Sequence, residues 1–332
     1  MMKLEHLFEN YQLAREALGN WPCALPASDE QLSRFRISSN AVYPFSAEQG
    51  LCFLRLAPAS EKREQNLRGE LEFIQYLRGR GYPALEPLPA EDGSLCLALD
   101  TQWGRWFASA FRAVPGEPIE DLPLTGELVR AYGRSLGRLH SLSAEFQPTI
   151  PKWSWEDALH WAADTLTHHQ GPEDMIDAVK KLEAELRQLP QSADTFGLVH
   201  YDFEPDNVFF EQKTKTCSVI DFDDGMYHWY ALDVEQALDS LQQLPIPAGL
   251  DAAGEFLRGY GEERAYTQEM EALRPLMGRF VDLFGYAGVY RGLTSRPALE
   301  PDWLVNLRAK LELHLREIRR RVCGAESGPG SR

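Results

Sequence analysis

The sequence lacks several features that would place it in particular classes of protein. Its 332 residues include five scattered cysteines and no Cys-x-x-Cys pair, so neither a disulfide framework nor a zinc site is expected. No run of about 18 uncharged apolar residues is present, which predicts that no helix crosses a membrane. The first residues also lack the apolar core of a signal peptide. These absences favour a cytoplasmic protein that does not bind membranes.

A basic excess is missing as well. The formal net charge is -16 and the sequence pI is about 5.0. An acidic surface repels the phosphates of nucleic acid and weakly favours cationic partners. The basic residues at 316–321 interleave with apolar ones, which is typical of the solvated face of a terminal helix. No nucleic-acid partner is therefore expected, and the charge alone names no substrate.

The spacing of apolar residues changes near residue 115. Before it, an opening amphipathic helix and a helix at 62–80 accompany short expected strands at 32–38, 41–45, 51–57, 95–99 and 105–114. After it, helical periods dominate at 125–143, 155–169, 173–189, 231–244, 252–261, 269–294 and 302–322. This order predicts an α+β fold in two lobes, with a small β-rich N-lobe at 1–114 and a larger helical C-lobe at 115–323. A Gly- and Ser-containing stretch at 324–332 is expected to be a flexible tail.

One loop between apolar strands carries the most informative residues. His200, Asp202 and Asn207 follow the spacing H-x-D-x-x-x-x-N, and Asp221 comes at the end of a later apolar strand. Phosphoryl transfer to a hydroxyl group needs a carboxylate near the attacking oxygen and a divalent cation that neutralises phosphate charge. Asp202 fits the catalytic base. Asn207 and Asp221 offer the hard oxygen ligands that Mg²⁺ prefers.

These motifs resemble those of the aminoglycoside phosphotransferase family, H-x-D-x-x-x-x-N followed by I-D-[FW]-[DEG]. The second is matched at 220–223, and His140 and Asp233 match flanking elements of that family. The family shares its protein-kinase-like fold with the choline and homoserine kinases. The resemblance implies an enzyme that uses Mg²⁺ and ATP (or GTP) and moves the γ-phosphate to a hydroxyl of a small molecule.

The resemblance also implies a nucleotide site in the first lobe. Arg55 takes the place of the cation that contacts the α- and β-phosphates, where many kinases have lysine. Ser39 and Asn40 match a short loop that covers the phosphates, and 110–115 matches the hinge. Glu70 lies in the apolar stripe of the helix at 62–80, and a buried glutamate needs a cation, for which Arg55 is the obvious partner. The alternative is a surface glutamate beside neighbouring arginines.

The acceptor site is less defined. Acidic and aromatic residues near the motifs are candidates for contact with a cationic amine or sugar: Glu204, Asp206, Asp223, Asp224 and Trp229. For the two aspartates after Asp221, assistance to the metal or a solvated turn are the alternatives. Ordinary packing is the alternative for the tryptophan.

Two other functions remain open. The first keeps the chemistry and changes the acceptor to choline, homoserine or a protein Ser/Thr side chain. The second is a catalytically silent nucleotide-binding scaffold on the same fold.

Overall fold

The computed structural model describes residues 10–37, 40–48, 50–294 and 301–324. Contacts divide the chain into two compact units. The larger unit contains residues 10–152 and Ser192–Arg274, and it holds every candidate site residue that the structure describes. The smaller unit contains Trp153–Gln191 and the described residues from Pro275 onward. The expected lobe boundary after residue 114 falls inside the larger unit and stays a prediction.

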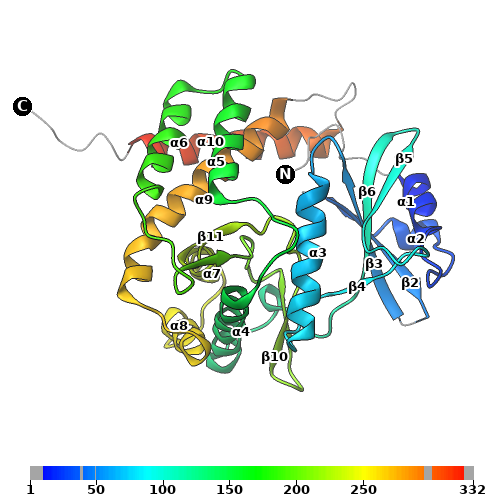
Figure 1. The fold of residues 1–332 in the computed structure, drawn as a ribbon, viewed down its shortest axis with the longest axis horizontal. Coiled ribbons are helices and arrows are strands. Elements are labelled where there is room, and N and C mark those ends of the chain that lie inside the picture. Colours follow the sequence, from blue (N-terminus) through cyan, green and yellow to red (C-terminus); the bar gives the residue numbers. More distant parts are fainter. Residues whose placement is uncertain (1–9, 38–39, 49, 295–300, 325–332) are drawn as a thin grey trace, which may run out of the picture. The chain divides into compact units, whose positions relative to one another are not determined.

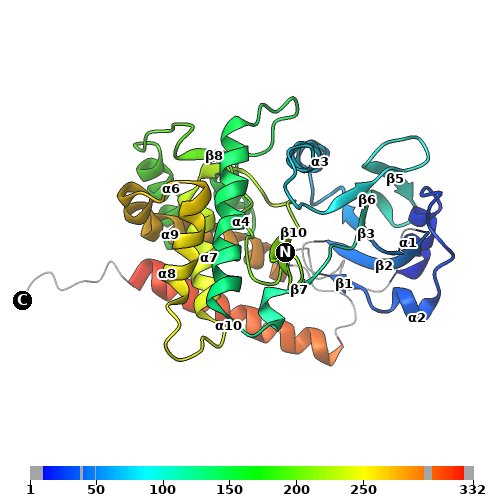
Figure 2. The same ribbon diagram turned by 90° about the horizontal axis from the view of Figure 1, so that it is seen from below.

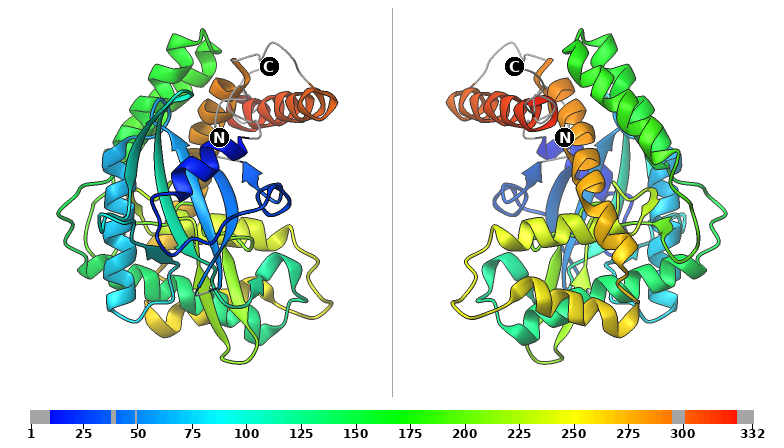
Figure 3. Two further views of the ribbon diagram at one scale, coloured as in Figure 1. Left: turned by 90° about the vertical axis from the view of Figure 1, so that its right-hand side faces the viewer. Right: turned by 90° about the vertical axis from the view of Figure 1, so that its left-hand side faces the viewer.

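An antiparallel sheet forms the first part of the larger unit (Figure 1). Its strand order is β1-β2-β3-β6-β4, and β5 also pairs with β6. Figure 3 shows these strands side by side in blue and cyan. The strands are β1 (Arg36–Ile37), β2 (Ala41–Ala47), β3 (Gly50–Pro58), β4 (Glu86–Leu88), β5 (Leu97–Thr101) and β6 (Gly104–Arg112).

Helices cover both faces of this sheet. They are α1 (Tyr11–Leu18), α2 (Asp29–Leu32) and α3 (Glu64–Gly79), and Figure 1 shows the sheet between α3 and α1. Because side chains alternate along a strand, Leu54 and Leu56 lie on one face of β3, where they share a core with Leu13 of α1. Arg55 lies on the opposite face, toward α3. The alternation thus directs a cation away from the apolar core.

The sequence-based prediction was wrong for the first strand. Ser28 accepts a hydrogen bond from the main chain of Gln31 and caps the short helix α2, so the buried Leu32 closes a helix and does not begin a strand. Only β1 follows. The predicted opening helix is present as α1, and its expected residues before 10 lie outside the described part of the chain, as do 325–332 of the expected tail. Gly324 ends a helix.

The second part of the larger unit places two loops beside each other. Strand β8 (Phe196–Leu198) leads into the loop at 199–207, which returns as β9 (Val208–Glu211). Strand β10 (Thr216–Val219) leads into the turn at 220–226, which returns as β11 (Tyr227–Trp229). Strand β9 pairs with β10, and β8 pairs with β11. The two segments that carry the predicted motifs therefore both run between the same two strand pairs.

Helices and short elements complete this unit. Figure 2 shows α4 beside α7 and α8. The very short β7 and β11 were not expected, since two or three residues carry too little periodicity to be recognised. The elements are β7 (Glu117–Pro118), η2 (Ile119–Asp121), α4 (Gly126–Glu145), α7 (Ala231–Gln242) and α8 (Ala252–Glu263).

The smaller unit is helical. It contains α5 (Trp155–His168), α6 (Glu173–Leu186), most of α9 (Gln268–Thr294) and α10 (Asp302–Gly324). The ring of Trp161 meets Phe284 edge-on at 5.3 Å, and Arg279 donates to Glu185 at 2.7 Å. None of the helices in the described part of the chain combines the length and apolar character needed to cross a bilayer.

The order of elements confirms the fold class expected from the sequence. A small β-rich lobe with one internal helix, α3, comes first, and a larger helical lobe follows it. The helical periods in the second half of the sequence agree with the observed helices to within a few residues at most ends, because long amphipathic patterns carry a strong signal.

Candidate active site

The loop at 199–207 is fixed by a buried carboxylate. Asp233 of α7 accepts the main-chain N–H groups of His200 at 2.7 Å and Tyr201 at 2.8 Å. Nε2 of His140 lies 3.0 Å from the same carboxylate. Burial opposes the charge of Asp233, yet the hydrogen bond from His140 keeps its pKa below the ordinary value. His140 therefore packs beside this loop and hydrogen-bonds to the carboxylate that holds it.

His200 links this loop to the turn at 220–226, which is called the acidic turn because it contains Asp221, Asp223 and Asp224. Its buried ring donates from Nε2 to the carbonyl of Ile220 at 2.9 Å, and Nδ1 accepts the main-chain N–H of Asp202 at 3.2 Å. Burial lowers the pKa of His200, which suits a neutral ring that donates at one nitrogen and accepts at the other. The main-chain N–H of Ile220 donates in turn to the carbonyl of Asn207 at 3.0 Å. These contacts give His200 a structural role, because it ties the two segments together.

Asp202 and Asn207 are in direct contact. Nδ2 of Asn207 lies 2.8 Å from Oδ2 of Asp202 and 3.1 Å from its main-chain oxygen. The amide donor is therefore committed to Asp202, and the amide oxygen is left for other partners. Burial, followed by the charges of Glu204 and Asp224, raises the pKa of Asp202 to about 8. Burial and the nearby negative charges thus favour the protonated form of this carboxyl group.

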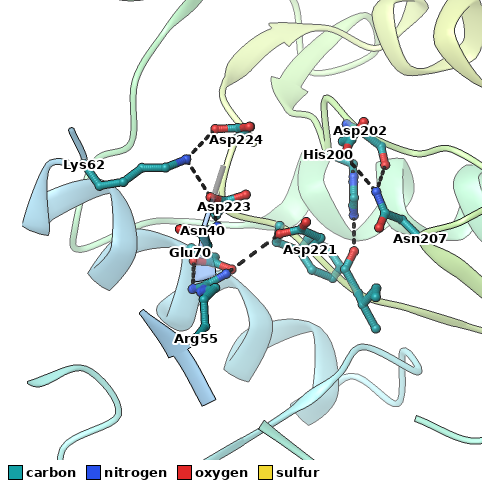
Figure 4. A network of polar contacts seen from close by, with 12 residues as sticks. Asn40, Arg55, Lys62, Glu70, His200, Asp202, Asn207, Asp221, Asp223 and Asp224 are labelled. Atoms are coloured by element: carbon teal, nitrogen blue, oxygen red, sulfur yellow. Dashed lines mark hydrogen bonds and ion pairs between the residues drawn. The ribbon is translucent and has the colours of Figure 1, made fainter. Parts of the chain in front are cut away.

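Asp221 directly follows Ile220, whose main chain is hydrogen-bonded to His200 and Asn207. Its φ of 61° is in the left-handed region, which few residues other than glycine adopt, and a third of its side chain is exposed. Burial, then the charge of Asp223, raises the pKa of Asp221 well above its ordinary value, and Asp202 contributes to the rise. Figure 4 shows the side chain of Asp221 near those of Asp202 and Asn207. The structure therefore brings the three motif residues together.

The predicted ion pair between Arg55 and Glu70 is confirmed. Nη1 and Nη2 of Arg55 bind the two carboxylate oxygens of Glu70 at 2.8 and 2.6 Å, and the side chain of Glu70 is 0% exposed. The surface alternative for this glutamate is therefore wrong. Nη1 of Arg55 is also 4.0 Å from Oδ1 of Asp221. The pair thus aims a cation at the acidic turn (Figure 4).

The acidic turn receives two further partners from the first lobe. Nδ2 of Asn40 lies 2.8 Å from Oδ2 of Asp223. Nζ of Lys62 lies 2.6 Å from the same oxygen and 2.9 Å from Oδ1 of Asp224. The side chain of Asp223 is only 2% exposed, so this residue is not part of a solvated turn, whereas Asp224 is half-buried. Ser39 lies outside the described residues.

Lysine contacts at this turn were not found from the sequence. Lys62 stands in a polar segment before α3 that no motif marks. Lys152 is buried and donates from Nζ to the carbonyls of Phe222 and Asp223, at 3.0 Å each. Burial, partly offset by Glu70, lowers the pKa of Lys152 to about 8. In the sequence, the signal that Lys152 could be buried is its position beside Pro151 and Trp153.

The remaining candidates differ in exposure. Burial and then the charge of Asp206 raise the pKa of Glu204 to about 7, and Asp206 itself is exposed. Trp229 is 1% exposed and meets Phe196 edge-on at 5.2 Å. Its burial favours the packing alternative, and a contact with an acceptor stays a prediction.

The fold and the paired loops define a protein of the kinase-like phosphotransferase class. The model of the phosphotransferase enzyme family (APH) matches residues 32–276, which include both loops and the Arg55–Glu70 pair. The chain belongs to this family.

Several of the curated relatives are named as kinases. The amicoumacin kinase of Bacillus subtilis (strain 168) is 25% identical over 276 residues, which are 78% of this chain and 79% of the relative. The homoserine kinase of Caulobacter vibrioides (strain NA1000 / CB15N) is 28% identical over 253 residues, or 72% of this chain and 74% of the relative.

Solved structures share the fold. An amicoumacin kinase in complex with AMP-PNP, Ca²⁺ and Ami aligns with a TM-score of 0.74 at 21% identity, covering 95% of this chain and 94% of the other. A microcompartment-associated aminopropanol kinase aligns with a TM-score of 0.67 at 20% identity, covering 95% and 98%. Family and fold together make this protein a small-molecule kinase, a phosphotransferase with a hydroxyl group as acceptor.

Proposed function

We propose that this enzyme transfers the γ-phosphate of Mg-ATP (or Mg-GTP) to a hydroxyl group of a small amino-bearing molecule, with Asp202 as the catalytic base. The observation that carries the proposal is the meeting of Asp202, Asn207 and Asp221 on two segments that His200 and Asp233 hold together. A carboxylate beside two hard oxygen ligands is the arrangement that phosphoryl transfer requires.

The proposed step moves one proton and one phosphoryl group. A carboxylate oxygen of Asp202 accepts the proton of the acceptor hydroxyl. The hydroxyl oxygen forms a bond to the γ-phosphorus while the bond from that phosphorus to the β–γ bridging oxygen breaks, and the nucleoside diphosphate leaves. Asn207 orients Asp202 for this step through the hydrogen bond at 2.8 Å.

A magnesium ion fits the residues present. In the described part of the chain no group of three or more His, Cys, Asp or Glu residues is arranged to hold a metal ion. Magnesium needs no such group here, because it is commonly held by one or two protein oxygens together with phosphate oxygens and water. Burial and neighbouring carboxylates raise the pKa values of Asp202 and Asp221, and a divalent cation beside them would favour their charged forms. Asn207 and Asp221 would hold the ion, which neutralises phosphate charge when bound.

The first lobe supplies the proposed nucleotide contacts. Arg55 is held by Glu70 on the side of the sheet that faces the acidic turn, so it is placed to contact the α- and β-phosphates. Asn40 is the described residue of the expected phosphate-covering loop, and it already reaches Asp223. We assign Ser39 to the same loop by its position in the sequence.

The acceptor is proposed to carry an amino group. Glu204, Asp206 and Asp224 place negative charge near Asp202, and the first two follow the base on its own loop. An ammonium group in the acceptor would be attracted to these carboxylates. The names of similar proteins agree with this class, since they include an aminopropanol kinase and aminoglycoside phosphotransferases.

The test combines an acceptor panel with a change at the base. Purified protein is incubated with magnesium, labelled ATP and either amino alcohols, aminoglycosides, choline, homoserine, a Ser/Thr peptide or neutral sugars. We expect transfer to an amino-bearing alcohol, and a fall in kcat of roughly 10²- to 10⁴-fold in Asp202→Ala with nucleotide binding retained.

Each outcome of this test separates the alternatives. Faster transfer to neutral sugars contradicts the amino-bearing class, and transfer to the peptide favours a protein kinase. Nucleotide binding without transfer to any acceptor favours the silent scaffold. An Asp202→Ala enzyme with normal turnover shows that another residue is the base.

A further inference from the structure

Lys62 joins two parts of the candidate site that are far apart in the sequence. It lies between β3, which carries Arg55, and α3, which carries Glu70, and it contacts carboxylates 161 and 162 positions later in the chain. Its side chain is 18% exposed and is directed at the acidic turn in Figure 4. Burial opposes its charge, yet Asp223 and Asp224 keep the pKa of Lys62 above the ordinary value. Lys62 is therefore a cation at this site.

Lys62 differs from Arg55 in the carboxylates that bind it. Both terminal nitrogens of Arg55 are bound by Glu70 within the same lobe, and the oxygen of the acidic turn that Arg55 approaches, Oδ1 of Asp221, is 4.0 Å away. The contacts of Lys62 go to the acidic turn itself. A lysine side chain is a compact charge on a flexible four-carbon stem, so its ammonium group can exchange one oxygen partner for another. Lys62 is thus a positive charge at the turn that can change its partner.

The partners of Lys62 adjoin a proposed metal ligand. Asp223 is two residues after Asp221. A cation bound at Asp221 and the ammonium group of Lys62 would therefore both contact the same short turn. Two positive charges close together repel each other, so Lys62 opposes the binding of a bare divalent cation. A nucleotide that brings phosphate oxygens gives the ammonium group a new partner.

We propose that Lys62 is a phosphate-binding residue which Asp223 and Asp224 hold in place until the metal–nucleotide complex arrives. This inference rests on the proposed kinase function and extends it by one residue. Asp223 and Asp224 are oxygen partners of the ammonium group that phosphate oxygens can replace. When the metal–nucleotide complex binds, Lys62 transfers to the terminal phosphates. It thereby weakens bare-metal binding and strengthens nucleotide binding.

The test uses two substitutions at Lys62 and one control. Lys62→Met keeps the length of the stem without its charge, and Lys62→Arg keeps the charge. Lys213→Met removes an exposed lysine from the turn between β9 and β10. Bare-metal affinity is measured with Mn²⁺ by electron paramagnetic resonance, and nucleotide affinity with Mg-AMP-PNP by calorimetry.

We expect the two affinities to change in opposite directions in Lys62→Met. Mn²⁺ should bind more tightly than to the wild type, while Mg-AMP-PNP should bind roughly 10- to 100-fold more weakly, because a charge-assisted contact is lost. Lys62→Arg should restore most of the nucleotide affinity, and Lys213→Met should match the wild type in both measurements.

Opposite changes distinguish this role from a structural one. Partial unfolding of Lys62→Met would weaken the binding of both ligands, and weakening of both contradicts the inference. Unchanged Mg-AMP-PNP affinity in Lys62→Met, beside a wild type that binds it, also overturns the inference. A wild type that binds Mg-AMP-PNP but phosphorylates no acceptor contradicts the proposed reaction and leaves the Lys62 assignment standing.

Discussion

Asp233 accepts the main-chain N–H of His200 at 2.7 Å, although the two residues are 33 positions apart in the sequence. The same carboxylate accepts the N–H of Tyr201, whose φ of 72° is in the left-handed region, and contacts Nε2 of His140. One side chain of α7 therefore fixes the bend from which Asp202 projects. The conformation of the loop at 199–207 depends on a residue that need not touch substrate.

Replacing Asp233 should destabilise the protein and reduce activity. Asp233→Ala leaves two main-chain donors and a histidine without their acceptor, for which a loss of about 3–5 kcal/mol in the free energy of unfolding is expected. Urea denaturation measures this loss. Asp239→Ala removes an exposed carboxylate from the same helix and should change stability by less than about 0.5 kcal/mol. Equal losses in the two variants contradict the assigned role.

The buried pair of Arg55 and Glu70 should show strong coupling. Glu70→Leu leaves a buried guanidinium whose next carboxylate, Asp221, is 4.0 Å away, so a loss of about 3–5 kcal/mol is expected. The double variant with Arg55→Met removes both charges and should be more stable than Glu70→Leu alone. Denaturation of the four proteins of this cycle gives the coupling free energy, and simple additivity would falsify the ion-pair account.

Nucleotide affinity gives the cycle a second readout. The double variant recovers stability without recovering a cation, so it should bind Mg-ATP as weakly as Arg55→Met. A double variant that regains wild-type nucleotide affinity would show that Arg55 does not contact phosphate.

The motif residues were found from the sequence because their chemistry is tied to local spacing. Asp202 and Asn207 share one loop, and Asp221 follows a strand whose apolar residues are easily recognised. Glu70 was placed against Arg55 because a helical stripe and a strand's alternation each predict a direction. In these cases a short segment contains the whole signal.

Lys62 and Lys152 were missed because their partners are distant in sequence. Lys62 reaches Asp223 across 161 positions, and Lys152 bonds to main-chain carbonyls, which have no sequence signature at all. The strand expected at 32–38 failed for a local reason, since the capping of α2 by Ser28 outweighed a weak β pattern. Long-range polar contacts are decided by the tertiary fold and not by local propensity.

Glycines allow α4 and α8 to approach closely. A Cβ atom on Gly259 would lie 1.9 Å from the carbonyl oxygen of Arg130, and one on Gly133 would lie 1.9 Å from that of Phe256. Gly259→Ala should therefore cost more than about 3 kcal/mol of stability, because backbone atoms must move apart. Gly261, in the same helix, has open space around its Cβ position, so Gly261→Ala should stabilise by about 0.5–1 kcal/mol. Thermal unfolding of the two variants measures this contrast, and equal effects contradict the close approach.

Buried His228 should make the protein sensitive to acid. Its ring is 0% exposed, and burial lowers its pKa from 6.5 to about 3. Below pH 6.5 the imidazole of His228 is protonated in the unfolded chain, whereas in the folded protein it stays neutral down to about pH 3. Stability is therefore complete above pH 6.5 and is lost as the pH falls toward 3, by up to about 1.4 kcal/mol per pH unit.

The substitution His228→Gln should remove this part of the pH dependence. Between pH 7.5 and 5.5 the variant's free energy of unfolding should fall by about 1 kcal/mol less than that of the wild type, whatever its stability at neutral pH. The difference is read from urea midpoints at several pH values. His140 and His200, whose pKa values burial also lowers, still contribute in the variant, so some slope remains. His314→Gln, at an exposed position of α10, should follow the wild type. Parallel curves for His228→Gln and the wild type would show that His228 is protonated equally in the folded and unfolded chains.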